Sequence, residues 1–274
     1  MAETQWNKLG DYLKETQILG SIQNTLYWDQ NTGMPRKGAS WRSEQLTYIA
    51  KVLHARNSSE EFSNLIQSAK NELLDSEQNS NNQLFIKNKK RNINLLTKEF
   101  NRERNLDPKL VESLAKAKSK GYESWQEAKK KSDFKIFLPF FEELVKLRIE
   151  EAKQISDQYS PWETLAQPYE PELTLKWLNK LFQPLKETIP ELIREINQSQ
   201  KTNWNLSPES QQNLCSKLLD EFGRDKDLVV VSKSPHPFSI TLGPNDYRIT
   251  TRIVEGEPLS SFLATAHEWG HSIY

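Results

Sequence analysis

Two histidines near the carboxyl end of the sequence stand four residues apart, and a glutamate directly follows the first. They are His267 and His271, with Glu268 between them. Residues four apart on an α-helix are offset by only about 40° around its axis, so both imidazoles would face the same way. Two nitrogen ligands one turn apart suit one tetrahedral zinc ion. The pattern therefore predicts half of a zinc site, although a pair of histidines can also arise by chance or serve a structural purpose.

The glutamate of this motif has the chemistry of a general base. A zinc ion lowers the pKa of a bound water molecule from near 16 to about 7. Glu268 can reach that water without taking a coordination position, and it can accept the proton as the water attacks a peptide carbonyl. A general base of this kind contributes about a hundred-fold to ten-thousand-fold in rate. The three residues together indicate a metallopeptidase.

An amphipathic helix has to carry the motif. Apolar residues recur at helical spacing through the last segment, at Leu259, Phe262, Leu263, Ala266, Gly270 and Ile273. They predict a zinc-binding helix over about 258–274. Two short β-branched runs, 228–231 and 247–254, precede it with Pro and Gly between them. These runs predict a small sheet within about 226–254, beside the helix.

Helix-capping patterns mark where several other helices begin and end. A capping box from Ser58 to Glu61 predicts one start, and Asp107 and Ser207, each followed by proline, predict two more. Gly223 is expected to end the helix that Ser207 begins. The 75–82 stretch reads as a turn-rich loop.

The middle of the chain also reads as helical. The apolar stretch 138–149 predicts a central core helix, and Pro184 and Pro190 are expected to kink or split the segment 174–196. The sequence shows no internal repeat and no long linker. We therefore expect residues 1–274 to form a single, mostly helical domain.

Composition narrows the class of protein. Lys plus Arg and Asp plus Glu number 37 each, so the electrostatic basis for binding nucleic acid or an anionic membrane is missing. The single cysteine, Cys215, excludes an intramolecular disulfide and suggests a core thiol in a reducing compartment. The first residues contain no apolar signal segment, and no stretch approaches the roughly 20 apolar residues of a membrane span. We expect a soluble, cytoplasmic protein.

Several co-linear segments carry a family resemblance. They are Leu26–Pro35 with Gly38, Arg42 and Gln45-Leu46, then Leu165–Pro171, His236-Pro237-Phe238, Asp246–Thr250 and His267–His271. In order and spacing they resemble the motifs of the thermostable (Taq-type) metallocarboxypeptidases, metallopeptidase family 32. The resemblance extends over nearly the whole sequence.

The resemblance implies a mainly helical, zincin-like fold around a long groove. It implies a zinc-dependent carboxypeptidase that acts on peptides with a free C-terminus, binds one zinc ion per chain and is a cytoplasmic homodimer. Carried over to this sequence, His267 and His271 are metal ligands and Glu268 is the catalytic base. His236 and Arg248 fall on motifs near the groove, which makes them candidates for contacting substrate. Alternatively, His236 is a hydrogen-bonded turn residue and Arg248 pairs with a buried carboxylate.

The sequence departs from the family pattern after the motif. The family takes a further zinc ligand, a glutamate, from the next helix and binds the substrate's terminal carboxylate with later motifs, whereas Tyr274 is the last residue here. We therefore expect an N-terminal part that is inactive alone. Five apolar side chains would then lie on an open groove wall: Phe262, Leu263, Trp269, Ile273 and Tyr274.

Two other functions compete with the carboxypeptidase hypothesis. One is a zinc endopeptidase or aminopeptidase built on the same helical motif, although no acidic motif for a free amine is evident upstream. The other is a helical scaffold or interaction protein with a degenerate zinc site. The intact trio of His267, Glu268 and His271 favours an enzyme, because a scaffold has no physical need for it.

Overall fold

The structure is a computed structural model, which describes residues 4–77, 83–196 and 206–273. The helices in these ranges are α1 (Gln5–Asn31), α2 (Ala39–Asn57), α3 (Glu60–Glu77), α4 (Gln83–Arg104), α5 (Pro108–Lys131), α6 (Leu138–Ile155), α7 (Pro161–Ala166), α8 (Leu175–Glu195), α9 (Pro208–Glu221) and α10 (Pro258–Ile273). Two short 3-10 helices are η1 (Arg36–Gly38) and η2 (Phe134–Ile136). The strands are β1 (Val229–Lys233), β2 (Ser239–Gly243) and β3 (Asp246–Thr251).

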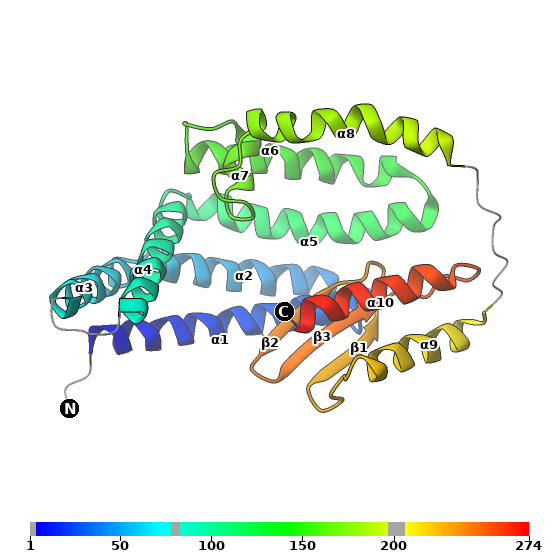
Figure 1. Cartoon of the computed structure of the whole chain (residues 1–274), viewed down its shortest axis with the longest axis horizontal. Helices are drawn as coiled ribbons and strands as arrows, with labels where there is room; N and C mark the ends of the chain where they lie inside the picture. The colour runs from blue at the N-terminus through cyan, green and yellow to red at the C-terminus, as the bar shows by residue number, and fades with distance from the viewer. Residues whose placement is uncertain (1–3, 78–82, 197–205, 274) are drawn as a thin grey trace.

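The long helices run along the long axis of the molecule in two groups (Figure 1). α1 and α2 pack side by side, and α5 packs on α2 and carries α6 on its other side. α3 and α4 cross one end of α1, and β2 packs on α1 nearer its other end. The predicted fold class, mainly α with a small sheet beside the last helix, is confirmed.

An apolar core joins α1 to α3 and α4. Its buried members are Leu9, Tyr12, Phe62, Ile66, Ala69, Leu73, Ile86, Ile93 and Phe100. The ring of Tyr12 stacks on that of Phe62 with a centroid distance of 5.3 Å, and Phe62 meets Phe100 edge-on at 6.0 Å. Aromatic pairs of this kind add to the stabilisation that burial alone gives.

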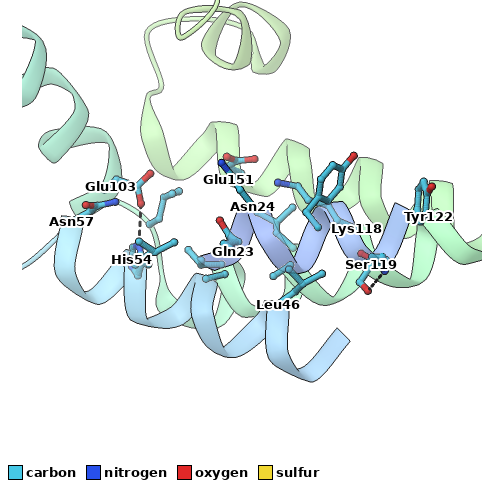
Figure 2. Close-up of a pocket in the computed structure, with 18 residues that line it drawn as sticks. Gln23, Asn24, Leu46, His54, Asn57, Glu103, Lys118, Ser119, Tyr122 and Glu151 are labelled. Carbon is cyan, nitrogen blue, oxygen red and sulfur yellow. Dashed lines mark hydrogen bonds and ion pairs between the residues drawn. The ribbon is translucent and has the colours of Figure 1, made fainter. Parts of the chain in front are cut away.

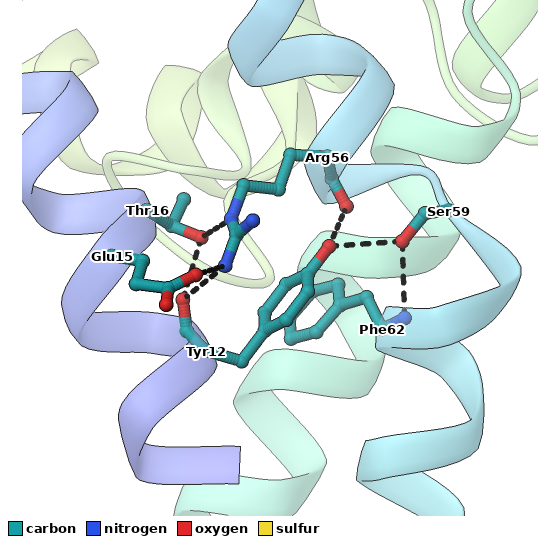
Figure 3. A network of polar contacts seen from close by, with 6 residues as sticks. All are labelled: Tyr12, Glu15, Thr16, Arg56, Ser59 and Phe62. Carbon is teal, nitrogen blue, oxygen red and sulfur yellow. Dashed lines mark hydrogen bonds and ion pairs between the residues drawn. The ribbon is translucent and has the colours of Figure 1, made fainter. Parts of the chain in front are cut away.

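Polar contacts fix the corner where α2 passes into α3 (Figure 3). The Tyr12 hydroxyl lies 2.8 Å from the carbonyl of Arg56 and 2.9 Å from the hydroxyl of Ser59. The Arg56 guanidinium lies over the Tyr12 ring at 3.8 Å, and it donates to Thr16 at 2.8 Å and to Glu15 at 2.6 Å. Tyr12 of α1 therefore contacts both α2 and α3, and these contacts fix the orientation of α1 relative to the two other helices.

The sheet has the strand order β1-β3-β2, with β1 parallel and β2 antiparallel to β3. β2 therefore lies at an edge, while β3 is central. Residues from α9, β1, β3 and α10 form a second apolar cluster: Leu219, Val229, Ile249 and Trp269. The predicted sheet region is confirmed, and β2 is a strand that the β-branched runs did not predict, since Ser239–Gly243 is short and ends in glycine.

Most predicted helix boundaries are confirmed. Asp107 and Ser207 are N-caps followed by proline, and Gly223 follows α9 with φ of 76°, a conformation that suits glycine. The cap of α3 was placed one residue early, because Ser59, not Ser58, accepts the hydrogen bond from the backbone N–H of Phe62. The predicted loop at 75–82 is helical up to Glu77, and its remainder lies outside the described residues. Cys215 is buried, as expected.

Two predictions for the middle of the chain are wrong. The stretch 138–149 lies in α6 but is not a central core helix, since Phe140, Phe141 and Val145 remain partly exposed and the residues that α6 buries are Glu151 and Ala152. The segment 174–196 is not split, because α8 continues through both of its prolines, whereas a kink at either proline stays a prediction. None of the helices in the described ranges combines the length and hydropathy of a bilayer-spanning helix.

Candidate metal centre

The helix α10 turns one face to the protein and another to solvent. The buried face carries Ser261, Thr265, Glu268 and Trp269. Trp269, which was expected on an open wall, instead packs in the cluster of α9, β1, β3 and α10. Leu263 and Ile273 are exposed as expected, at 63% and 67%, Phe262 is partly buried, and Tyr274 lies outside the described residues. The two histidines of the motif lie on the exposed face.

Hydrogen bonds between buried polar side chains hold α10 in this orientation. The Ser261 hydroxyl donates to the Gln211 carbonyl oxygen at 2.8 Å, and the Gln211 amide donates to the backbone oxygen of Val254 at 3.0 Å. The Thr265 hydroxyl lies 2.8 Å from the hydroxyl of Thr251 and 2.8 Å from the backbone oxygen of Ser261. Because buried polar groups need partners, this network ties α10 to α9 and β3 in one rotational setting.

The two histidines converge through the same ring atom. The Nε2 atoms of His267 and His271 are 3.1 Å apart, with the rings perpendicular and their centroids 4.7 Å apart. Two nitrogen ligands at 2.0–2.1 Å from one ion in tetrahedral geometry would be about 3.4 Å apart. The pair therefore fits a shared metal ion. Within the described residues, no group of three or more His, Cys, Asp or Glu side chains could hold a metal, so these two supply only part of a ligand set.

Glu268 lies on the buried side of the same turn, with 7% of its surface exposed. Burial raises the pKa of its carboxyl group, while His267, His271 and, to a smaller extent, His236 act in the opposite direction. The carboxylate is therefore shielded from bulk solvent and lies close enough to both imidazoles to interact with them. A group with a raised pKa is also a better proton acceptor than a free carboxylate.

A cavity of about 470 Å³ opens beside the motif. Residues 237–241, from the end of the β1–β2 connection into β2, form one wall, and Glu268 and His271 form the other. Since β2 is an edge strand, its backbone faces this space without another strand between. The cavity therefore brings a potential base and a potential metal ligand to one surface that a peptide could reach.

His236 lies close enough to the trio to influence the pKa of Glu268. Its Nδ1 atom is 2.6 Å from the backbone oxygen of Pro237. Since a carbonyl oxygen only accepts, Nδ1 donates in this contact, and Nε2 is left for another partner. The Ser234 hydroxyl donates to the backbone oxygen of His236 at 2.6 Å. These contacts match the turn role considered for His236, and a substrate contact would have to use Nε2.

Arg248 is engaged by a neighbour on its own strand. Its guanidinium donates to both carboxylate oxygens of Asp246, at 2.8 and 3.0 Å, and lies 5.6 Å from the centroid of the Trp28 ring. Hydrogen bonds from Arg248 lower the pKa of Asp246. The predicted pairing with a carboxylate is thus present, although Asp246 is partly exposed and not buried. Arg248 does not line the cavity beside the motif.

Comparison with known proteins shows the family of the chain. The family model of the Carboxypeptidase Taq (M32) metallopeptidases matches residues 8–274. The chain belongs to this family. Carboxypeptidase 1 of Bacillus subtilis is 28% identical to this chain. The alignment is 274 residues long and covers 96% of this chain and 52% of the relative. Thermostable carboxypeptidase 1 of Thermus thermophilus is also 28% identical, over 99% of this chain and 55% of the relative.

Solved structures give the same result for the fold of this M32 chain. The crystal structure of BsuCP superposes with a TM-score of 0.89 at 27% identity, over 99% of this chain and 54% of that one. Trypanosoma cruzi metallocarboxypeptidase 1 gives a TM-score of 0.78 at 26% identity, over 98% of this chain and 54% of that one. The chain spans about half the length of the curated relatives that it matches.

The opening motif of the M32 chain lies far from the metal motif in sequence but contacts the same sheet. Phe238 meets Tyr27 and Trp28 edge-on, each at 5.6 Å. Arg42 joins the end of α1 to α2, because it donates to the backbone oxygen of Leu26 at 2.5 Å and to Asp29 at 2.6 Å. Sequence reasoning missed this aromatic platform. The sequence did show two adjacent aromatic residues, Tyr27 and Trp28, in the opening motif. Their partner, Phe238, is more than 200 residues away, and no local pattern could identify it.

Proposed function

We propose that this chain supplies two metal ligands and the catalytic base of a zinc-dependent metallocarboxypeptidase, which removes single residues from peptides with a free C-terminus. His267 and His271 are the ligands in this proposal, and Glu268 is the base. The observation that carries it is the convergence of two Nε2 atoms, 3.1 Å apart, beside a buried carboxylate on one cavity wall. Neutral imidazole nitrogens suit zinc better than the oxygen-preferring cations.

The chemistry divides between the ion and the protein. Zinc, when bound, lowers the pKa of a water molecule to about 7 and polarises a carbonyl group. The Glu268 carboxylate takes the proton as the water oxygen forms a bond to the scissile carbonyl carbon. It then returns that proton to the amide nitrogen as the carbon–nitrogen bond breaks, which releases the C-terminal residue. Partial burial keeps the carboxylate aimed into the cavity and not at bulk water.

The active protein requires at least one more metal ligand than the described residues of this chain offer. Catalytic zinc sites keep three protein ligands and one open position. The resemblance assigns the third ligand to a glutamate on a following helix, with one zinc ion per chain. We propose that residues 1–274 alone have no peptidase activity, because two ligands hold the ion too weakly.

His236 and Arg248 have supporting roles in the proposal. Nε2 of His236 forms the hydrogen bond to substrate in this proposal, because Nδ1 is already engaged by the backbone oxygen of Pro237. Arg248, paired with Asp246, stiffens the sheet beside the substrate path. We also propose, from the family resemblance, a cytoplasmic homodimer in which residues 1–274 form one mostly helical domain. The single domain is supported by α1, which contacts both α3 and β2 and so connects the helical part to the sheet.

The decisive test is a Glu268→Gln substitution in an active form of the protein. Residues 1–274 are fused to the half of the Bacillus subtilis relative that this chain does not match. We expect the fusion to release single amino acids from a free C-terminus, and the variant to lose about a hundred-fold or more in rate, since glutamine cannot accept the proton. Mass spectrometry of the digests measures both.

Two controls accompany this test. Zinc content of the Glu268→Gln variant should stay at one per chain, because Glu268 is not a ligand in the proposal. A substrate amidated at its C-terminus should be cleaved poorly. A variant that keeps more than about a tenth of the rate would contradict the role of Glu268. Internal fragments, or a ladder from the N-terminus, would contradict the carboxypeptidase assignment.

A further inference from the structure

A second cavity, of about 480 Å³, lies between α1, α2 and α5 (Figure 2). We call it the helical trough, and six of the side chains that line it are Gln23, Tyr27, Leu53, Lys118, Tyr122 and Glu151. Its α5 wall extends from Val111 to Tyr122, which is about 16 Å at 1.5 Å per residue. An extended chain advances roughly 3.3 Å per residue, so the trough has the length of about five peptide residues.

The trough shares a wall with the cavity beside the metal motif. Tyr27 and Asn24 both line the trough. The ring of Tyr27 meets that of Phe238 at 5.6 Å, and the Asn24 amide donates to the backbone oxygen of Thr241 at 3.1 Å. Phe238 and Thr241 line the motif cavity. The trough and the motif cavity therefore lie on opposite sides of these two contacts, next to one another.

Among the charged side chains that line the trough, both carboxylates have partners within the described residues and Lys118 has none there. Glu151 accepts from Arg148 at 2.5 Å and lies 3.7 Å from Arg102, and Glu103 lies 3.1 Å from the Nδ1 atom of His54. Both carboxylates that line the trough are thus paired. Lys118, in contrast, has no hydrogen bond and no ion pair to any residue in the described parts of the chain.

The surroundings of Lys118 are those of a groove. Its side chain is exposed to solvent, yet the nearby helices desolvate the ammonium enough to lower its pKa. The Arg148 guanidinium lowers that pKa further, and Glu151 partly offsets it. An added carboxylate would therefore relieve a local excess of positive charge in a place that a ligand can reach.

The remaining lining suits a peptide. The lining includes the aliphatic side chains of Leu46 and Leu53 from α2, Leu106 from the α4–α5 connection and Leu114 from α5, together with the amide groups of Gln23 and Asn57. Peptide and small-molecule sites commonly combine apolar walls with a few polar groups that fix orientation, at volumes of about 300–1,000 Å³. A site for a free phosphate would not need such a length of apolar wall.

From these observations we propose that the helical trough binds the part of a peptide substrate that precedes the cleaved bond, and that Lys118 selects peptides with an acidic side chain there. The proposal rests on the proposed peptidase function and adds a preference for acidic peptides. The trough is lined by residues of the segment from α1 to α6, whereas the family resemblance assigns the terminal carboxylate to other, later motifs.

The test uses binding, so that it does not depend on turnover. A panel of rhodamine-labelled heptapeptides amidated at the C-terminus carries one Glu, moved through each position, and each peptide has a Gln twin. Amidation leaves the Glu side chain as the only carboxylate. Fluorescence anisotropy with the 274-residue chain should show one or two Glu positions that bind about five-fold more tightly than their twins. Raising the salt concentration should reduce this ratio.

Three variants locate the effect. Lys118→Met should abolish the Glu preference, and Lys118→Arg should restore it. Lys120→Met is the matched control, because a residue two positions along α5 projects about 200° away, and it should behave as wild type. Circular dichroism confirms that each variant folds.

Two results would overturn the proposal: a wild-type chain that shows no Glu preference at any position, or a preference that survives in Lys118→Met. Failure of the peptidase function shows itself elsewhere, as absence of amino-acid release by the fusion protein from peptides with free C-termini. The two failures are therefore distinguishable.

Discussion

His267 and His271 differ from Glu268 in their exposure to solvent, and this difference divides their chemistry. Ligands on the outer face of α10 can receive an ion from solution without any opening of the fold. The base sits a third of a turn away, where neighbouring groups restrict its motion. If α10 were rotated so that Glu268 took the place of His267, the carboxylate would lie at an exposed position.

Zinc titration of the 274-residue chain tests the ligand pair at the scale of single residues. We expect weak binding at one equivalent, because only two ligands are present within the described residues. His271→Ala should remove this binding, whereas His236→Ala should keep it, since Nδ1 of His236 is already committed to a backbone oxygen. Calorimetry measures both. Equal binding by the chain and its His271→Ala variant would show that the ion is held elsewhere.

At the scale of elements, α10 depends on Gln211 of α9 for its setting. Gln211 is 1% exposed and bonds to Leu206, Val254 and Ser261. Gln211→Ala should lower the free energy of unfolding by about 2–4 kcal/mol, because it leaves several buried polar groups without partners. Urea denaturation measures the change. Gln212→Ala, an exposed neighbour, should cost less than about 0.5 kcal/mol. Similar values for the two variants would contradict the role of this network.

The same helix shows what the sequence could predict and where it could not. The motif and its position on a helix after a small sheet followed from local spacing and are confirmed. The buried face did not follow. Apolar spacing alone would place Leu259 on the buried face, yet Leu259 is exposed and the buried turns carry Ser261 and Thr265. Those polar residues are buried because α9 and β3 offer them partners, which is tertiary information.

Long-range pairings in the candidate site were equally hidden. Arg248 could be expected to pair with a carboxylate, and Asp246, two residues away on the same strand, was a local candidate. Its second partner, Trp28, is 220 residues away and reaches it only because α1 packs against β2. The free cation in the helical trough was hidden for the same reason: Lys118 resembles the other lysines of α5 until the neighbouring helices are placed around it.

At the scale of the whole molecule, apolar surface gathers on one side. α8 buries none of its residues, although it carries Leu181, Leu185 and Leu192 on one face. α6, which lies with α8 at the top of the view in Figure 1, exposes parts of Phe141 and Val145. Soluble monomers rarely expose contiguous apolar patches of more than a few hundred Å². This side is therefore the part of the chain best suited to contact another polypeptide.

The last prediction concerns the association of the 274-residue chain. At about 50 µM we expect it to elute with a mass above its 32.0 kDa, because burying the apolar face of α8 against a second copy removes that surface from water. Leu181→Lys combined with Leu185→Lys should restore the monomer mass. The matched control, Asn179→Lys with Gln183→Lys, adds the same charge at exposed polar positions of the same helix with the same spacing, so it should leave association intact. Size-exclusion chromatography with light scattering measures the mass.

A monodisperse 32.0 kDa wild-type chain would show that the apolar face of α8 is stable in contact with water. An equal effect of both double variants would show that the added charge, and not the loss of the apolar face, prevents association.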